Sequence, residues 1–301
     1  MKIIAFYLPQ FHAFPENDKW WGKGFTEWTN TKKGRPNFKG HYQPHTPLNK
    51  NYYDIVENNN VLPEQIKMAK EYGVDAFCFY HYWFAQGKKL MEKPIERFLA
   101  DKTLDMPFCL CWANENWSRR WDGSEQSILI AQDYGDRQDR KNHIDYLIEF
   151  FSDERYLRDE DGRPVLLIYK PQLIDNLDIL LTEWRTAAIA AGFPGICFAC
   201  QFPQSDRTVR DKFDHWIDFE PIATTGIPGE DFLKALKICP KYALEVGLTK
   251  VLQLSKVRTY KKYYYRDAVK ASAKRPIEDG KEWVGAFTGW DNTARRGRNS
   301  I

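Results

Sequence analysis

The chain lacks both a long apolar run and a strong excess of charge of either sign. None of its stretches approaches the roughly 18 consecutive apolar residues that a membrane span requires. Its 44 basic residues nearly balance 41 acidic ones, and a net charge of +3 is too small to favour nucleic acid or an anionic membrane as the main partner. We therefore expect no integral membrane segment and no nucleic-acid partner, while the oligomeric state stays open.

Cysteine is also scarce, with six residues in the chain. Cys78, Cys109 and Cys111 fall in apolar, strand-like runs, where cysteine acts as a small buried hydrophobe. Cys197 and Cys200 form a C-x-x-C pattern, but a strand places residues three apart on opposite faces, so we expect the two thiols to diverge. The cysteines therefore suit a reducing compartment and favour neither zinc nor redox chemistry.

Several other signals are missing. Residues 1–9 carry one charge and an apolar stretch too short for a signal peptide, so we read them as a first strand and expect a cytoplasmic protein. No G-x-G-x-x-G follows that strand, and neither G-x-S-x-G nor H-E-x-x-H occurs. His12, His41 and His45 share a loop without metal-ligand spacing. We expect neither a metal nor a cofactor.

Aromatic residues, in contrast, are abundant, at 15% of the chain with 11 tryptophans. Three of the tryptophans lie in the segment from Cys111 to Gly123, which follows an apolar run. The flat aromatic groups of this segment are Trp112, Trp117 and Trp121. Its hydrogen-bonding groups are Asn114, Glu115, Arg119 and Asp122. Apolar faces beside polar tips suit a ligand with hydroxyls on its edge and C–H bonds on its face, most simply a sugar. The alternative is that the tryptophans form core and the charges a solvated rim.

Short apolar runs alternate with helical patterns along the chain. The predicted strands are Lys2 to Leu8, Asp75 to Tyr82, Pro107 to Trp112, Pro164 to Tyr169, Gly195 to Gln201, His215 to Phe219 and Trp283 to Thr288. The predicted helices are Leu62 to Tyr72, Leu90 to Ala100, Arg137 to Phe151, Ile174 to Ala191 and Thr259 to Ser272. Continuous apolar strands between helices indicate a parallel sheet, either open or closed into a barrel.

Two features favour a (β/α)₈ barrel of the TIM type over an open sheet. The dinucleotide-binding motif of the open sheet is missing, and polar or aromatic residues follow nearly every predicted strand, where a TIM barrel builds its site. Only seven strands are visible, so the eighth βα unit is expected to be absent from this chain. We expect one domain over residues 1–301, with residues 9–60 as a long loop over the barrel mouth, serving either function or cover.

Six segments together resemble the WbsX-type family. They are Phe6 to His12, Gly24 to Asn30, Tyr80 to Phe84, Trp112 to Trp117, Asp218 to Pro221 and Gly289 to Thr293. These proteins are bacterial relatives of glycoside hydrolase family 99, encoded among polysaccharide and O-antigen biosynthesis genes and often labelled glycosyltransferases. The resemblance implies a barrel, a glycan ligand, no metal and pocket-lining roles for Tyr7 and Tyr169. The hydrolases cleave α-mannosides with two glutamates in an Asn-Glu-Trp-x-Glu-Gly motif, which this chain lacks.

On the residues themselves, paired carboxylates suit glycoside chemistry because one must be held protonated and the other ionised. We therefore take Glu115 and Glu220 as catalytic candidates. Arg119 beside Glu115 either keeps a carboxylate ionised, binds a phosphate, or forms a structural salt bridge. The substrate-binding candidates are Tyr7, Trp28, His81, Trp112, Asn114, Trp117, Arg119, Trp121, Tyr169, Gln201, Trp290 and Asp291.

The sequence predicts a carbohydrate-active protein that acts on a bacterial surface polysaccharide or its precursor. The expected reaction is cleavage or transfer of an α-mannoside-like glycoside at the C-terminal face of the barrel, with a glycan or a lipid-linked oligosaccharide as partner. Two alternatives remain open. One is a glycosyltransferase that uses an activated donor in O-antigen or lipopolysaccharide biosynthesis, and the other is a non-catalytic glycan-binding protein.

Overall fold

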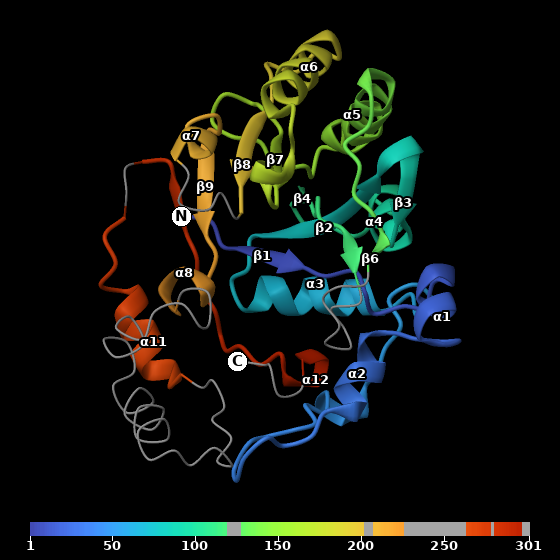
Figure 1. Ribbon diagram of the computed structural model, residues 1–301, viewed down its shortest axis with the longest axis vertical. Helices are drawn as coiled ribbons and strands as arrows, with labels where there is room; N and C mark the ends of the chain where they lie inside the picture. Colours follow the sequence, from blue (N-terminus) through green and yellow to red (C-terminus); the bar gives the residue numbers. More distant parts are fainter. Residues whose placement is uncertain (119–127, 202–206, 226–262, 278–279, 297–301) are drawn as a thin grey trace. The chain divides into compact units, whose positions relative to one another are not determined.

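Apolar runs form parallel strands, and the segments between them form helices (Figure 1). The computed structural model describes residues 1–118, 128–201, 207–225, 263–277 and 280–296. The strands are β1 (Ile4–Tyr7), β2 (Ala76–Phe84), β3 (Lys88–Leu90), β4 (Phe108–Trp112), β5 (Trp117–Ser118), β6 (Ile128–Ile130), β7 (Val165–Ile168), β8 (Cys197–Cys200), β9 (His215–Asp218) and β10 (Glu282–Val284). The main sheet has the order β1-β2-β4-β7-β8-β9-β10, β3 pairs with β2, and β5 pairs with β6.

Helices occupy most of the connections between these strands. The helices are α1 (Pro15–Trp21), α2 (Glu27–Lys33), α3 (Val61–Glu71), α4 (Glu92–Ala100), α5 (Arg137–Phe151), α6 (Leu177–Ala190), α7 (Arg207–Arg210), α8 (Ile222–Thr225), α11 (Tyr265–Ser272) and α12 (Thr293–Arg296), with 3₁₀ turns η1 (Leu48–Lys50), η2 (Ala85–Gly87) and η3 (Pro171–Leu173). Local signals set their ends: Asp136 caps α5 by accepting a hydrogen bond from Asp139 N, and α3 is followed by Gly73 at φ 77°. None of the described helices combines the length and apolar character needed to cross a bilayer.

The chain divides into two compact units. Unit 1 comprises Met1–Thr29, Leu48–Trp117 and Ile128–Trp216, and unit 2 comprises Asn30–Pro47, Ser118–Ser127 and Ile217–Ile301. Unit 1 contains strands β1, β2, β4, β7 and β8, which pair in parallel and in sequence order, as in a (β/α) barrel. The predicted α/β class with a parallel sheet is therefore confirmed.

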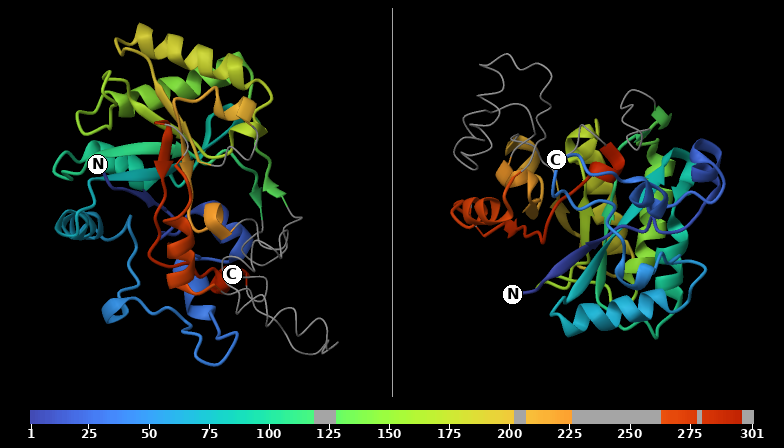
Figure 2. Two further views of the ribbon diagram at one scale, coloured as in Figure 1. Left: turned by 90° about the vertical axis from the view of Figure 1, so that its left-hand side faces the viewer. Right: turned by 90° about the horizontal axis from the view of Figure 1, so that it is seen from below.

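Unit 1 has its core between the sheet and four helices, which Figures 1 and 2 show along one face of the sheet. Each helix contributes a contact to that outer face: Gln65 of α3 contacts Tyr7, Phe98 of α4 contacts Phe79, His143 of α5 contacts His81, and Trp184 of α6 contacts Trp112. Side chains alternate along a strand, so Phe6, Tyr80 and Cys111 lie on the opposite, inner face. Each large apolar side chain buried in this layer stabilises the fold by about 1.5–3 kcal/mol.

Unit 2 contains the end of β9, strand β10 and helices α8, α11 and α12. Arg275, just after α11, forms an ion pair with Asp218 at the end of β9, with Nη2 and Oδ2 2.7 Å apart. Gly285, after β10, comes so close to this strand end that a Cβ atom added to it would lie 1.9 Å from the carbonyl oxygen of Asp218. Only glycine fits that approach.

The seven predicted strands are all present, although β10 begins one residue earlier and ends sooner than expected. Strands β3, β5 and β6 were not predicted. Helix α5 has the predicted bounds, and α3, α4 and α6 differ from them by a few residues; α11 begins at Tyr265, and residues 259–262 of the predicted helix lie outside the described part of the chain. Residues 9–60, expected as a loop, contain the seven-residue helices α1 and α2. That these residues cover a barrel mouth, and that the chain is one domain, stay predictions.

Candidate glycan site

Five side chains meet on the inner face of the sheet in unit 1, and we name them the inner-face cluster: Phe6, Tyr80, Cys111, Tyr169 and Gln201. Gln201 Nε2 donates to the Tyr80 hydroxyl at 2.8 Å, and Cys111 Sγ donates to Gln201 Oε1 at 3.4 Å. The Tyr80 ring stacks on Phe6 at 5.5 Å and meets Tyr169 edge-on at 6.1 Å. Burial raises the pKa of the Tyr80 phenol well above its usual value, so its proton stays available for hydrogen bonding.

The cluster lies toward the carboxyl ends of its strands. Tyr80 is the middle residue of β2, Cys111 is the last but one of β4, and Tyr169 and Gln201 follow β7 and β8 directly. Gln201 is only 1% exposed, whereas Phe6, Tyr80 and Tyr169 are half-buried. An anchored amide beside partly open aromatic rings can contact both the hydroxyls and the C–H face of a sugar.

An ion pair lies at the same edge of the sheet. Lys170 Nζ bonds Glu115 Oε1, and the ammonium group lies 5.5 Å from the centre of the Tyr169 ring. Both side chains are partly exposed, at 25% for Lys170 and 22% for Glu115. The site therefore offers an accessible carboxylate next to a cation.

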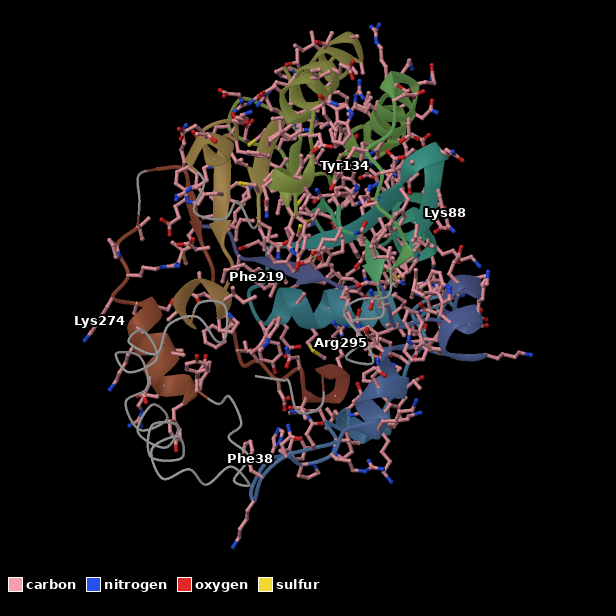
Figure 3. The ribbon with its side chains drawn as sticks, viewed as in Figure 1. Phe38, Lys88, Tyr134, Phe219, Lys274 and Arg295 are labelled. Atoms are coloured by element: carbon pink, nitrogen blue, oxygen red, sulfur yellow. The ribbon has the colours of Figure 1, made fainter. Side chains whose placement is uncertain are left out.

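Asn114 holds the backbone of Lys170, one member of this ion pair. Its Oδ1 accepts a hydrogen bond from Lys170 N at 2.7 Å, and its Nδ2 donates to Lys170 O at 2.8 Å. Tyr134, labelled in Figure 3, donates its hydroxyl proton to Asn114 O at 3.1 Å. With 0% exposure and its amide in use, Asn114 joins the loop after β4 to the loop after β7.

Two other predicted ligand contacts, Tyr7 and His81, belong to the outer face. Tyr7 donates to Gln65 Oε1 at 2.5 Å, and burial together with nearby Tyr53 raises the pKa of its phenol. His81, 1% exposed, lies 2.8 Å from His143 between their Nε2 atoms. The contacts place both residues in the layer between the sheet and the helices, and we leave them out of the proposed ligand contacts.

Trp112 is also part of this layer. Its side chain is 2% exposed, its ring lies 5.6 Å from that of Trp184, and its Nε1 donates to Trp83 O at 3.2 Å. A ring covered in this way has no face left for a sugar. Trp112 therefore fits the alternative of a core tryptophan, and we leave it out of the proposed ligand contacts.

Two tryptophans from the aromatic loops also pack within unit 1. Trp117 is 6% exposed, with its ring 5.5 Å from that of Tyr82. Trp28 is half-buried; its Nε1 donates to Tyr53 O at 2.7 Å, and its ring contacts Phe11 at 4.7 Å. The predicted residues Arg119 and Trp121 lie outside the described residues.

Glu220, the second catalytic candidate, is buried in unit 2. Its Oε1 accepts hydrogen bonds from Thr224 Oγ1 at 2.6 Å and Ser272 Oγ at 2.9 Å, and its Oε2 accepts one from Thr224 N at 3.1 Å. The side chain is 0% exposed and lies 3.6 Å from Arg275 Nη2. These contacts tie α8 to α11, and we leave Glu220 out of the proposed catalytic residues.

Asp291, in contrast, collects several donors in unit 2. Its Oδ2 accepts from His41 Nε2 at 3.0 Å, Gln43 Nε2 at 2.8 Å and His45 Nε2 at 3.2 Å, and its Oδ1 accepts from Thr293 N at 2.8 Å. Burial alone raises the pKa of this carboxyl, but the hydrogen bonds outweigh burial and hold the pKa well below its usual range. Asp291 is therefore a fixed negative charge.

Trp290, next to Asp291, is 42% exposed, more than any other predicted stacking residue within the described part of the chain. Its ring meets Phe219 edge-on at 6.3 Å. Trp290 thus keeps an accessible face for a ligand.

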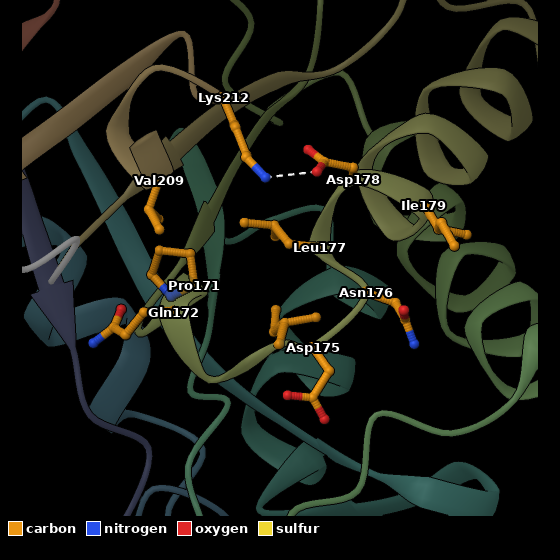
Figure 4. A pocket seen from close by; sticks show the side chains of 10 residues that line it. Pro171, Gln172, Asp175, Asn176, Leu177, Asp178, Ile179, Val209 and Lys212 are labelled. Carbon is orange, nitrogen blue, oxygen red and sulfur yellow. Dashed lines mark hydrogen bonds and ion pairs between the residues drawn. The ribbon is translucent and has the colours of Figure 1, made fainter. Parts of the chain in front are cut away.

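A cavity of about 370 Å³ lies elsewhere in unit 1, beside the loop after β7 and the start of α6 (Figure 4). Pro171, Leu177 and Val209 form apolar walls, and Lys212 Nζ pairs with Asp178 Oδ2 at 2.6 Å at its edge. Its size suits a small-molecule site. None of the predicted site residues is among those that line it.

The described part of the chain shows no group of three His, Cys, Asp or Glu side chains arranged to hold a metal ion. Around Asp291, the hydrogen bond from Asn37 N to His41 Nδ1 leaves the proton of that ring on Nε2, where it is donated to the carboxylate.

Sequence reasoning selected Tyr169, Gln201, Glu115 and Asp291 but left Phe6, Tyr80, Cys111 and Lys170 out of the candidate set. Phe6 and Tyr80 are the strand neighbours of Tyr7 and His81, so the phase of the alternation was missed by one residue. Lys170 could have been selected from the sequence, because it is the residue after Tyr169 and lies at the carboxyl end of a predicted strand.

Comparison with known proteins identifies relatives over almost the whole chain. Residues 3–301 match the family model described as Glycosyltransferase WbsX. Proteins named "Uncharacterized protein WxcX" from two strains of Xanthomonas campestris pv. campestris are each 38% identical over 295 residues, covering 98% of this chain and 39% of the relative. The chain thus spans about two fifths of the length of these curated relatives.

Among solved structures, the chain is similar to one described as "Structure of the GH99 endo-alpha-mannosidase from Bacteroides thetaiotaomicron". The TM-score is 0.43 at 13% sequence identity, over 85% of this chain and 68% of that chain.

Proposed function

Because the chain belongs to the family of WbsX glycosyltransferases, we propose that it holds a glycan at the inner-face cluster of unit 1 and there transfers a sugar by forming a glycosidic bond. The observation that carries this proposal is the cluster itself. Half-buried Tyr80 and Tyr169 offer aromatic faces, and Gln201, anchored by Tyr80 and Cys111, offers an amide at the carboxyl edge of the sheet.

The ion pair at this edge supplies the charges that sugar transfer needs. A transfer removes a proton from the acceptor hydroxyl and leaves negative charge on the departing group. Glu115 is a carboxylate that can accept a hydrogen bond from a sugar hydroxyl, and the Lys170 ammonium can stabilise a departing phosphate. Because Asn114 bonds both backbone atoms of Lys170, the loop that carries this cation keeps its place.

The same assignment extends to the biological setting. We propose that the substrate is a bacterial surface polysaccharide, such as O-antigen or lipopolysaccharide, or its lipid-linked oligosaccharide precursor. We also propose that residues 1–301 form a single carbohydrate-active domain. A cytoplasmic location is supported by the cysteines, since Cys78, Cys109, Cys111, Cys197 and Cys200 are buried and free. Cleavage of an α-mannoside in place of transfer is the competing reaction.

Calorimetry with α-mannose-containing oligosaccharides and lipid-linked glycan fragments tests the site. Replacing Tyr169 with Ala removes a stacking face and is expected to weaken binding by about 1–3 kcal/mol, roughly 5- to 150-fold in Kd. Tyr7→Phe is the control: this tyrosine ends strand β1 of the same sheet but faces the helices, so the loss of its hydroxyl is expected to leave glycan affinity unchanged.

Turnover separates the possible reactions. Wild-type protein is incubated with the acceptor glycan and radiolabelled sugar nucleotides, or with the glycan alone. Label in the glycan supports transfer, while shortened glycan without a donor supports cleavage. Binding without either product identifies a glycan-binding protein and refutes the proposed transfer. Equal glycan affinity of wild type and Tyr169→Ala removes the inner-face cluster as the site.

A further inference from the structure

The cavity beside the start of α6, which we name the α6 cavity, lies at the same edge of the sheet as the inner-face cluster, and both belong to unit 1. Pro171 lines it from the connection after β7, and Val209 lines it from α7, after β8 (Figure 4). The same two connections begin with Tyr169 and Gln201 of the cluster. Two residues of chain span at most about 7 Å, which limits the separation between Tyr169 and Pro171. Loops of this kind build the sites of (β/α) barrels.

Tyr134 connects the α6 cavity with the ion pair of the proposed site. Burial raises the pKa of its phenol to about 12, and the charges of Asp175, on the cavity, and Glu115, in the ion pair, add to the rise. Its hydroxyl is donated to the carbonyl of Asn114, whose side chain holds the backbone of Lys170. Because a Coulomb interaction weakens with distance, one carboxylate of the cavity and one of the ion pair both lie near this phenol. The cavity and the ion pair are therefore neighbours.

The α6 cavity combines apolar walls with polar groups that face solvent. Leu177 and Val209 present aliphatic surface, and Asp175 is exposed. Lys212 Nζ lies 2.6 Å from Asp178 Oδ2, with the two side chains 34% and 72% exposed. Such a lining can pack against the C–H groups of a sugar and form hydrogen bonds with its hydroxyls. The volume of about 370 Å³ is within the range of small-molecule sites.

The charges of the lining favour a neutral ligand over an anion. Asp175 and Asp178 are carboxylates, and Lys212 is the one cation among the described residues that line the cavity. This cation is already paired with Asp178. A phosphate group would therefore meet net negative charge, whereas the hydroxyls of a neutral sugar donate hydrogen bonds to carboxylates. The ammonium of Lys170, beside the cluster, is better suited to a phosphate-bearing donor.

We propose that the α6 cavity binds a neutral sugar unit of the acceptor glycan while the end of the glycan that receives the new sugar lies at the inner-face cluster; this inference rests on the proposed function. The aliphatic walls hold the ring of this distal unit, and Asp175 together with the Lys212–Asp178 pair bonds its hydroxyls. A single sugar cannot occupy the cluster and the cavity together. The site thereby selects acceptors of more than one unit.

Affinity measured against acceptor length tests the cavity. Calorimetry is performed with α-mannose oligosaccharides of one to four units. We expect Kd to fall by about tenfold or more once the chain is long enough to reach the cavity. Val209→Phe fills part of the cavity and should remove most of this gain, with the monosaccharide Kd within about twofold of wild type. Leu173→Phe is the matched control, because Leu173 is 43% exposed and is not among the lining residues, so the gain should persist.

A change of charge provides a second test, which does not depend on filling the cavity. Asp175→Asn keeps the size of the side chain but removes its charge, and we expect the affinity for the long oligosaccharides to fall by about three- to tenfold. Asp161→Asn is the control, because this carboxylate is 77% exposed and precedes β7, at the amino end of that strand. Urea unfolding verifies that each variant is folded. A trisaccharide phosphorylated on its distal unit that binds as tightly as the neutral one would overturn the charge argument.

Photochemical labelling locates the distal sugar without relying on turnover. An α-mannose trisaccharide with a diazirine on its distal unit is irradiated with the protein, and peptide mass spectrometry identifies the labelled residues. We expect labels within residues 171–179 or 208–212, which include the lining of the cavity. Labels confined to peptides that contain Tyr80 or Gln201 would place the distal unit at the cluster and overturn the inference.

The outcomes distinguish this inference from the proposed function. If wild type transfers sugar and folded Val209→Phe shows the same gain in affinity with acceptor length, the cavity site is overturned while the function stands. If wild type shows the gain and loses it in Val209→Phe but forms no glycosidic bond, the transfer fails while the cavity stands as a sugar site. The absence of any gain with length in wild type overturns the cavity site in either case.

Discussion

The buried histidine pair of unit 1 predicts a loss of stability in mild acid. The Nε2 atoms of His81 and His143 lie 2.8 Å apart, so one ring donates and the other accepts. Burial lowers the pKa of both rings and thereby keeps them neutral. Trp83 stacks on His143 at 4.5 Å, and Tyr146 stacks on His81 at 5.5 Å. A proton added to either ring would place a charge in this apolar layer, near the ammonium of Lys89.

The size of the effect follows from the pKa shift. Burial, assisted by Lys89, lowers the pKa of His81 from 6.5 to about 3, and burial together with His81 lowers the pKa of His143. Below pH 6.5 the unfolded chain therefore binds protons that the folded chain does not, and the free energy of unfolding falls with pH down to about pH 3. Each histidine contributes about 1.4 kcal/mol per pH unit, so His81 alone costs about 2 kcal/mol between roughly pH 6.5 and pH 5.

Urea unfolding at several values from about pH 7 to about pH 5 measures this slope. His143→Gln removes one of the two imidazoles, so the slope of unfolding free energy against pH is expected to fall by about 1.4 kcal/mol per pH unit below about pH 6.5. Tyr146→Phe is the control, because it alters a ring that stacks on His81 but keeps both imidazoles. Equal slopes for wild type and His143→Gln would refute the reasoning.

Two further substitutions test the packing of unit 1. Arg155→Lys is expected to lower the free energy of unfolding by about 2–4 kcal/mol. The guanidinium donates to the carbonyls of Phe98 and Leu104 as well as to Asp153, and the single ammonium group of lysine cannot make all these hydrogen bonds. A free energy of unfolding, measured in urea, within about 0.5 kcal/mol of the wild-type value would contradict this. Trp112→Ala should cost about 3–5 kcal/mol of stability, while calorimetry on the folded variant should show unchanged glycan affinity; a Kd raised tenfold would return Trp112 to the site.

The strands and most helices could be predicted because their signals are local. Continuous apolar runs gave β2 and β4, and the spacing of Ile144, Leu147 and Phe151 in α5 follows the helical period. Helices α1 and α2 were missed because each has seven residues, too few for a periodic pattern to show. The strong patterns are those of elements that bury a face over several turns.

The faces of the strands could not be predicted. A strand covered on both sides reads as apolar throughout, so nothing in Tyr80-His81 states which residue points inward. The structure assigns Tyr80 to the inner face and His81 to the helices, and the same one-residue shift separates Phe6 from Tyr7. The partners of Asp291 were hidden for another reason: His41 lies 250 residues away, and no short-range pattern encodes such a contact.

The double hydrogen bond between Asn114 and the backbone of Lys170 has a consequence for engineering. The side-chain amide of Asn114 bonds main-chain atoms of Lys170 and so links two loops, and this link does not involve the side chains of Glu115 and Tyr169. A library that varies Glu115 and Tyr169 while Asn114 is held constant would therefore change the chemistry presented to a sugar on an unaltered framework. Substituting Asn114 would instead remove the hydrogen bonds that join the two loops, so any change in binding by these variants would reflect altered loop geometry rather than altered specificity.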